Sequence, residues 1–138
     1  MKILVAVDSS QYSEKAVAKA VELAQKGGAE LIALAVAEQP LDMGEIAVPV
    51  DLSVHYEAVA AKALEKAVDI AKSKGMALRS VLEGGSSPAD NIIELAKKEG
   101  VDLIVTGSRG RTGLEKFLLG SVAAKVVSHA ACSVLVVR

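Results

Sequence analysis

Aromatic side chains are scarce in this sequence of 138 residues, which has no tryptophan, two tyrosines and one phenylalanine. Because 51% of the residues are nevertheless hydrophobic, the core has to be built from valine, isoleucine, leucine and alanine. So few rings offer no stacking surface for single-stranded bases. A formal net charge of −1 gives no electrostatic attraction to nucleic acid or to an anionic membrane. We therefore expect neither nucleic acid nor a membrane as a partner.

Cysteine is also nearly absent, since Cys132 stands alone. A single cysteine excludes an internal disulfide and suits a reducing compartment. No apolar run is long enough to cross a bilayer. The run after Lys2 is short and ends at Asp8 rather than at a small-residue cleavage site, which does not match a signal peptide. The expectation is one cytoplasmic domain that covers residues 1–138.

Strand-like segments alternate along the chain with segments that carry an apolar stripe at helical spacing. Strands are predicted at residues 3–7, 30–37, 77–83, 102–106 and 133–137. The first helix is predicted to begin at a serine cap, Ser10 or Ser13, and to end at Gly27-Gly28. Further helices are predicted at 55–73, 88–99 and 121–128, the second of these after a turn at Gly84-Gly85 and a serine cap. Weak alternation in 77–83 indicates an edge strand.

This alternation predicts an α/β fold: a single doubly wound, five-stranded parallel sheet with helices on both faces. The expected strand order is 3-2-1-4-5. In such sheets, ligands bind outside the carboxyl ends of the strands, at the point where the winding reverses direction. The reversal then falls between the first and fourth strands, which places Asp8 opposite Gly107.

The stretch after the fourth strand is rich in glycine. It reads Thr106-Gly107-Ser108-Arg109-Gly110-Arg111-Thr112-Gly113 and is followed by Leu119-Gly120-Ser121. Glycine lets a backbone reach positive φ and come close to a ligand. Loop amides and a helix N-terminus, with Ser121 as its cap, together favour phosphate. The predicted ligand therefore bears a phosphate that is held mostly by the backbone.

Other phosphate motifs fit less well. A P-loop requires a Lys-Ser/Thr pair at the helix start, but Leu119 and Val122 flank Gly120-Ser121. The turn after the first strand, at residues 8–11, has no glycine for a dinucleotide fingerprint. A flavodoxin-like loop of serine hydroxyls stays open but lacks flanking aromatics. A receiver domain would require an acidic pair after the first strand and an aspartate at the end of the third. Here Asp8 stands alone and the third strand ends in Glu83.

The pattern Gly107-x2-Gly110-x9-Gly120-Ser121 resembles the ATP-binding signature of the universal stress protein family. The start of the chain at residues 4–8 and its ending at residues 129–137 are also similar to that family. The resemblance implies a Rossmann-like, adenine nucleotide alpha hydrolase-like domain that is usually dimeric. It implies ATP or AMP as the ligand, with Mg or Mn as a candidate accompanying metal.

Carried over to this sequence, the resemblance assigns Asp8 to the ribose or adenine side and Val36 to the adenine slot. The glycines at 107 and 110 would let the chain pass close to ribose and phosphates, and the start of the last helix would meet the phosphates. The expected nucleotide-binding residues are Ala6, Val7, Asp8, Val36, Gly107, Ser108, Arg109, Gly110, Gly120, Ser121 and Val122.

No catalytic residue is predicted. Phosphoryl transfer needs a positioned base or a group that orients water, and no residue in the sequence can be assigned to either role. We expect a nucleotide-binding regulatory or stress-response module with little or no turnover. Two alternatives stay open. One is a family member that binds no nucleotide and acts through protein contacts, and the other is a slow ATP hydrolase.

Several residues carry two interpretations. Residues 38–54 form either a flap over the site or an excursion into solvent. Arg109, Arg111 and Lys116 either pair with phosphates or lie on a solvated loop face. His129 and Cys132 are expected to be structural rather than zinc-binding or nucleophilic. The apolar strand Val134 to Val137 is expected to pair with a second copy in a homodimer if it lies at the sheet edge.

Overall fold

The computed structural model describes residues 1–39, 50–109 and 119–138, without the side chains of residues 50 and 51. Five strands and four helices alternate along the described chain, as the sequence predicted. Their order is β1 (Lys2–Val7), α1 (Gln11–Gly27), β2 (Glu30–Glu38), α2 (Val50–Ser73), β3 (Arg79–Gly85), α3 (Pro88–Glu99), β4 (Leu103–Gly107), α4 (Ser121–His129) and β5 (Ser133–Val137). None of the described helices is both long and apolar enough to span a bilayer.

The strands form one parallel sheet in the order β3-β2-β1-β4-β5, which confirms the expected topology. β1 lies at the centre and pairs with β2 on one side and with β4 on the other. β3 and β5 are the two edges, as predicted for both. The winding therefore reverses between β1 and β4, where Val5 pairs with Val105. Polar residues that follow these two strands emerge side by side at the carboxyl edge of the sheet.

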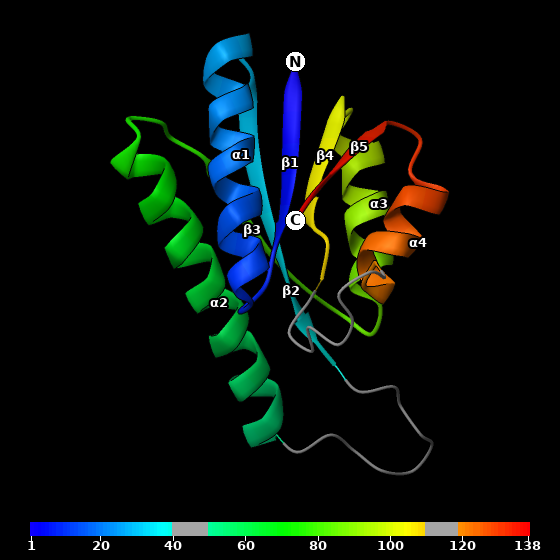
Figure 1. Cartoon of the computed structure of the whole chain (residues 1–138). Coiled ribbons are helices and arrows are strands. Elements are labelled where there is room, and N and C mark those ends of the chain that lie inside the picture. Colours follow the sequence, from blue (N-terminus) through cyan, green and yellow to red (C-terminus); the bar gives the residue numbers. More distant parts are fainter. Residues whose placement is uncertain (40–49, 110–118) are drawn as a thin grey trace.

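Two apolar layers cover the sheet, because both faces of its central strands are buried. Helices α1 and α2 pack on one face and α3 and α4 on the other (Figure 1). On β1, Ile3 and Val5 point into the first layer and Leu4 into the second, and all three are at most 1% exposed. The predicted apolar stripe of α1 is confirmed as core: its buried members are Ala16, Val17, Ala20, Val21 and Ala24.

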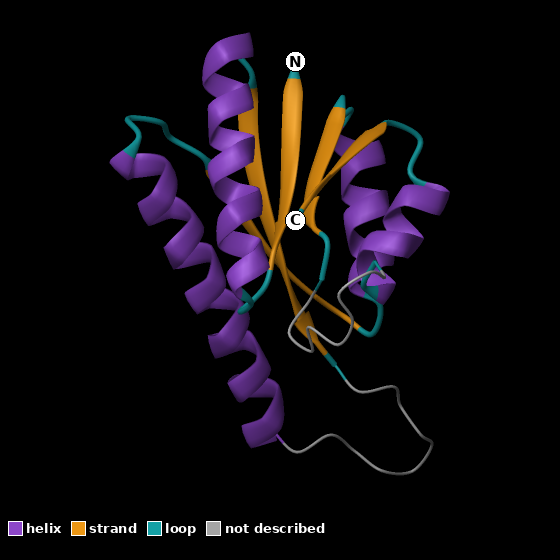
Figure 2. Cartoon of the chain, in the orientation of Figure 1, coloured by secondary structure: helices purple, strands orange, loops and turns teal. Residues whose placement is uncertain are grey.

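Two predicted assignments are wrong. The glycines at 84 and 85 belong to β3 rather than to a turn, because they continue the ladder with Ala37 and Glu38. Helix α2 begins at Val50, five residues before its predicted start at His55, so the predicted connection of residues 38–54 is shorter than expected. Residues 40–49 of that connection lie outside the described residues, and the flap interpretation with them. Figure 2 shows how far the first turns of α2 extend beyond the carboxyl edge of the sheet.

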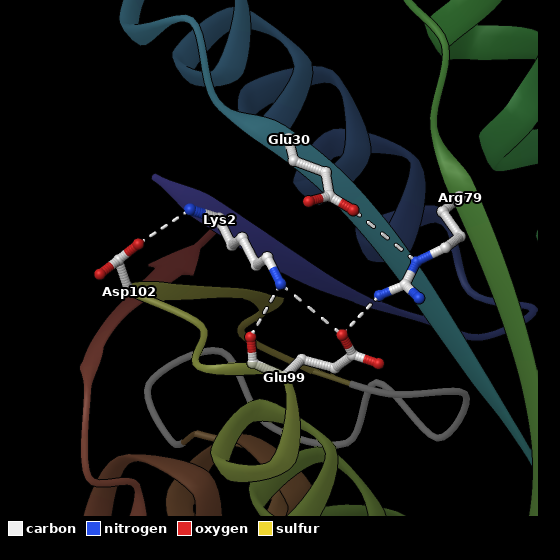
Figure 3. A network of polar contacts seen from close by, with 5 residues as sticks. All are labelled: Lys2, Glu30, Arg79, Glu99 and Asp102. Atoms are coloured by element: carbon white, nitrogen blue, oxygen red, sulfur yellow. Dashed lines mark hydrogen bonds and ion pairs between the residues drawn. The ribbon is translucent and has the colours of Figure 1, made fainter.

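A network of charged residues ties the opposite, amino edge of the sheet together (Figure 3). Arg79 on β3 contacts Glu99 at the end of α3 at 2.8 Å and Glu30 at the start of β2 at 3.8 Å. Lys2 on β1 donates through its backbone amide to Asp102 at 2.8 Å and through Nζ to the Glu99 carbonyl at 3.1 Å. The Arg79 guanidinium holds the pKa of Glu99 below its ordinary value. These contacts stabilise the amino edge of the sheet, whereas ligands of such folds bind at the carboxyl edge.

Candidate functional site

A cavity of about 300 Å³ opens at the carboxyl edge of the sheet, at the point where the winding reverses. Its size is at the lower end of the range typical of small-molecule sites. Residues from three strands, from three helices and from the segments that join them line it. They are Ala6, Val7, Asp8, Ser10, Ser13, Leu34, Val36, Glu38, Pro88, Ile92, Thr106, Gly107, Arg109, Gly120, Ser121, Val122 and Ala123.

Nine of the eleven residues predicted from sequence lie on this cavity wall. Of the other two, Ser108 lies behind the wall and Gly110 lies outside the described residues, as do Arg111 and Lys116. The structure therefore brings together residues more than 110 positions apart, from Ala6 to Val122.

The turn after β1 holds Asp8 rigidly at the cavity. Its carboxylate Oδ1 accepts a hydrogen bond of 2.8 Å from the backbone amide of Ser10, and its own amide donates to Ser13 Oγ at 3.0 Å. Ser10 is the N-cap of α1, and its hydroxyl accepts from the Ser13 amide. Asp8 thus has the turn role that aspartate commonly takes after a strand and also lines the cavity. The two roles are compatible, because a carboxylate has several lone-pair sites.

Gly107, at the end of β4, is explained by packing rather than by positive φ. The described glycines with positive φ are Gly28, Gly75 and Gly100. A Cβ atom on Gly107 would lie 3.0 Å from Tyr12 Cβ and 3.1 Å from the Tyr12 carbonyl oxygen. The absence of a side chain therefore lets the first turn of α1 pack directly against β4. Gly107 is expected to let the chain pass close to a ligand. The structure shows that it also lets β4 lie close to α1.

Ser108 connects the fourth strand to the last helix. Its backbone amide donates to the carbonyl of Val137 on β5 at 2.8 Å, and its carbonyl accepts from the amide of Gly120 at 2.7 Å. The residue is 7% exposed. Because its polar backbone is used inside the protein, Ser108 supports the site rather than facing it. The backbone amide of Gly120 is likewise engaged inside the protein, although the residue lines the cavity.

The start of α4 lines the opposite side of the cavity from Asp8. Gly120 is the N-cap, so the assignment of Ser121 as cap is wrong by one residue, and no side chain in the described part of the chain caps this helix end. Ser121, Val122 and Ala123 follow as the first three helical residues and all line the cavity. The first amides of a helix have no acceptor within the helix. They carry the partial positive charge that attracts anions.

Arg109 brings a positive charge to the cavity wall. Its guanidinium carbon lies 5.8 Å from the centre of the Tyr12 ring, and its buried Nε has no hydrogen-bond partner among the described residues. A side-chain hydrogen bond with Arg109 holds the pKa of Tyr12 below its ordinary value, and the nearby positive charge acts in the same direction. The charged side chains on the described part of the wall are therefore separated by sign. The negative ones are Asp8, which follows β1, and Glu38, which ends β2; the positive one is Arg109, which follows β4.

Sequence reasoning missed part of the wall. Glu38 ends β2 at the same edge as Asp8, and its polar character directly after an apolar strand was a usable signal. Pro88 and Ile92 come from one face of α3, four residues apart. Nothing in the local sequence marks them, because only the packing of α3 beside α4 turns that face toward the cavity.

Two further candidates lie away from this cavity. His129 ends α4, and its Nδ1 lies 3.0 Å from the Lys125 carbonyl oxygen. Cys132 precedes β5, and burial raises the pKa of its thiol, which disfavours the nucleophilic thiolate. In the ranges 1–39, 50–109 and 119–138, no three His, Cys, Asp or Glu side chains gather closely enough to hold a metal ion.

The sheet order, the two helical layers and the cavity at the reversal point define a doubly wound α/β domain with a ligand cavity at its topological switch. The model of the universal stress protein family matches residues 1–138. The chain therefore belongs to the universal stress protein family. Universal stress protein YxiE of Bacillus subtilis is 38% identical over 146 residues, which cover 99% of this chain and 98% of YxiE.

Solved structures agree with this assignment. Universal stress protein UspA from Lactobacillus plantarum is 33% identical, with a TM-score of 0.83 over 100% of this chain and 97% of that one. A universal stress protein from Archaeoglobus fulgidus in complex with dAMP is 26% identical, with a TM-score of 0.75 over 100% of this chain and 98% of that one. A further universal stress protein, in complex with cAMP, is 28% identical, with a TM-score of 0.72 over 100% and 96% of the two chains.

Proposed function

We propose that this protein binds an adenine nucleotide in the cavity at the carboxyl edge of its sheet and acts as a regulatory or stress-response module. The observation that carries the proposal is the polarity of that cavity. A carboxylate held by its own turn, Asp8, lies on one side, and the first residues of α4 lie on the other. Complexes of related proteins with dAMP and with cAMP support the choice of ligand class.

The chemistry of the wall suggests how such a ligand lies. Leu34, Val36 and Ile92 give an apolar surface suited to a purine ring. Asp8 accepts hydrogen bonds from ribose hydroxyls. Ser121 and Val122 turn their amides to the first phosphate, where the helix dipole favours negative charge. Arg109 adds a charge-assisted contact to the same group.

AMP and ATP both fit this arrangement. A cavity of about 300 Å³ holds a nucleoside monophosphate, and further phosphates of ATP would extend past Arg109 toward solvent. A Mg or Mn ion, if one takes part, would arrive with those phosphates. Turnover is proposed to be slow or absent, because hydrolysis needs a group that orients the attacking water. Asp8, a carboxylate on the cavity wall, already accepts from the Ser10 amide.

Calorimetric titration of the purified protein with AMP and with ATP tests the proposal. Asp8→Asn should weaken binding roughly 10- to 100-fold, because hydrogen bonds to a charged group contribute about 1.5–3 kcal/mol. The asparagine oxygen can still accept from the Ser10 amide, so the turn is expected to persist. Asp69→Asn is the matched control, since Asp69 is exposed on α2 and does not line the cavity. No heat with either nucleotide at millimolar concentration would refute the proposal. Equal binding by the Asp8 variant and the control would refute the role of Asp8.

We further propose a cytoplasmic homodimer that forms through β5. β5 pairs with β4 at one edge of the described sheet, and Val134, Leu135, Val136 and Val137 on it are each partly exposed. An apolar edge strand needs a cover in order to avoid uncontrolled pairing, and a symmetric copy provides one. Sedimentation at micromolar concentration should give the mass of two chains, and Val136→Lys should give one. A wild-type monomer would contradict the dimer without affecting the nucleotide proposal.

A further inference from the structure

We infer that Tyr12 is a positioning residue: its ring holds the guanidinium of Arg109 in the direction from which it meets the phosphate of a bound nucleotide. The inference rests on the proposed function, because it concerns the same cavity. It adds a residue from α1 that does not itself line that cavity.

Arg109 is the group whose position needs an explanation. It follows β4 and lines the cavity, and its Nε is buried without a hydrogen-bond partner among the described residues. A buried donor on a charged group is costly when it is left unsatisfied. The remaining donors of the guanidinium lie in a planar fork that matches phosphate oxygens, so an anion in the cavity can pair with them. The place of Arg109 on the cavity wall, together with this donor set, points to an anionic ligand.

Tyr12 supplies the support for this side chain. The guanidinium carbon lies 5.8 Å from the centre of the Tyr12 ring, within the range of a cation–π contact. The ring is itself well anchored, because the main chain of Tyr12 packs against Gly107 at distances that leave no room for a Cβ atom. The anchor lies two residues before Arg109, so the ring and the guanidinium are fixed relative to the same end of β4.

Such support matters because arginine has a long side chain with many rotamers. Ordering a side chain of this kind on binding costs about 0.5–1.5 kcal/mol. A ring that already holds the guanidinium removes part of that cost before the ligand arrives. Loss of the ring should therefore weaken the binding of the phosphate and leave the binding of the nucleoside unchanged.

The test compares AMP with adenosine, which lacks the phosphate, in calorimetric titrations of the full chain. Tyr12→Leu should weaken AMP binding about two- to fivefold, the fold-change that corresponds to a cation–π contact at a partly exposed site. Its affinity for adenosine should stay at the wild-type value. Tyr12→Phe keeps the ring face but loses the hydroxyl that interacts with the Arg109 side chain, so it should lose less AMP affinity than Tyr12→Leu. Tyr12→Gln is a second ringless variant for the case in which Tyr12→Leu does not fold.

A double-mutant cycle with Arg109→Gln separates positioning from a general effect on the fold. If Tyr12 acts through Arg109, Tyr12→Leu should produce no further loss of AMP affinity in the Arg109→Gln background. Equal losses for AMP and adenosine, or full additivity of the two substitutions, would overturn the inference. A wild-type protein that binds adenosine and AMP equally would also overturn it, while leaving nucleoside binding at the cavity intact. A wild-type protein that binds neither would instead refute the proposed function, and this inference with it.

Discussion

Replacing Gly107 with alanine tests whether this glycine serves the packing of α1 on β4. The added Cβ atom would lie 3.0 Å from Tyr12 Cβ, 3.1 Å from the Tyr12 carbonyl oxygen and 3.2 Å from its carbonyl carbon. Comfortable contacts between carbon atoms lie near 3.5–4.0 Å, so each contact is several tenths of an ångström too short. Two of the three atoms are main chain and cannot rotate away. Helix α1 must therefore shift relative to the sheet.

The sign of the stability change distinguishes the two explanations of Gly107. Without a clash, alanine in a strand is more stable than glycine by roughly 0.5–1 kcal/mol, because glycine loses more backbone entropy on folding. Overpacking of this kind costs about 1–3 kcal/mol. We therefore expect Gly107→Ala to lower the free energy of unfolding by about 1–3 kcal/mol. With a urea slope of about 2 kcal/mol per molar, the midpoint should fall by roughly 0.5–1.5 M.

Urea unfolding followed by circular dichroism measures this midpoint, and Gly27→Ala is the matched control. Gly27 is the last residue of α1, and a Cβ there would meet Met1 Sδ at an ordinary 3.8 Å. Helix propensity favours alanine over glycine by up to about 1 kcal/mol, so the control should be neutral or stabilised. A Gly107→Ala protein as stable as wild type, or more stable, would refute the packing explanation.

Two smaller predictions concern the ends of the sheet. Ser10→Ala should lower the free energy of unfolding by about 1 kcal/mol in urea titrations, because it removes the hydroxyl that caps α1 by accepting from the Ser13 amide at 3.3 Å; an unchanged midpoint would mean that this cap is not stabilising. Glu99→Gln should flatten the acid dependence of stability. The pKa of Glu99 is lowered in the folded state by Arg79, so the unfolded chain takes up the proton first and the wild type loses this stabilisation as the pH falls below about 4.5. Urea midpoints between about pH 5 and pH 3 that fall equally in both proteins would contradict the role of this pair.

The fold was predictable because its signals are local and repeated. Each buried strand is a short apolar run, each helix carries an apolar stripe, and their alternation leaves few possible topologies. The carboxyl-edge position of Asp8 and Gly107 follows from the strand order alone. The ends of the strands were less predictable. Gly84 and Gly85 favour a turn by local propensity, but their pairing with β2 overrides it, since the ladder satisfies backbone groups that a turn would leave exposed.

The candidate site divides in the same way. Nine residues predicted from the sequence lie on the cavity wall. Strand ends and glycine-rich turns marked Asp8, Gly107, Gly120 and Ser121, whereas residues such as Val36 were implied by the family resemblance. The sequence could not identify Pro88 and Ile92, which reach the cavity through the packing of one helix beside another. The sequence also could not distinguish Ser108 from the residues that face the cavity. The backbone groups of Ser108 are hydrogen-bonded to Val137 and Gly120.

By itself, then, the sequence determined the element order, the sheet topology and the edge at which a ligand would bind, since these follow from hydrophobic periodicity and chain connectivity. Tertiary structure alone decided which atoms remain available there. The amide of Gly120 is used inside the protein, the first residues of α4 line the cavity, and Gly107 accommodates Tyr12. The physical reason is that hydrogen bonds and close contacts form between segments far apart in the chain, and no local pattern encodes the distance between them.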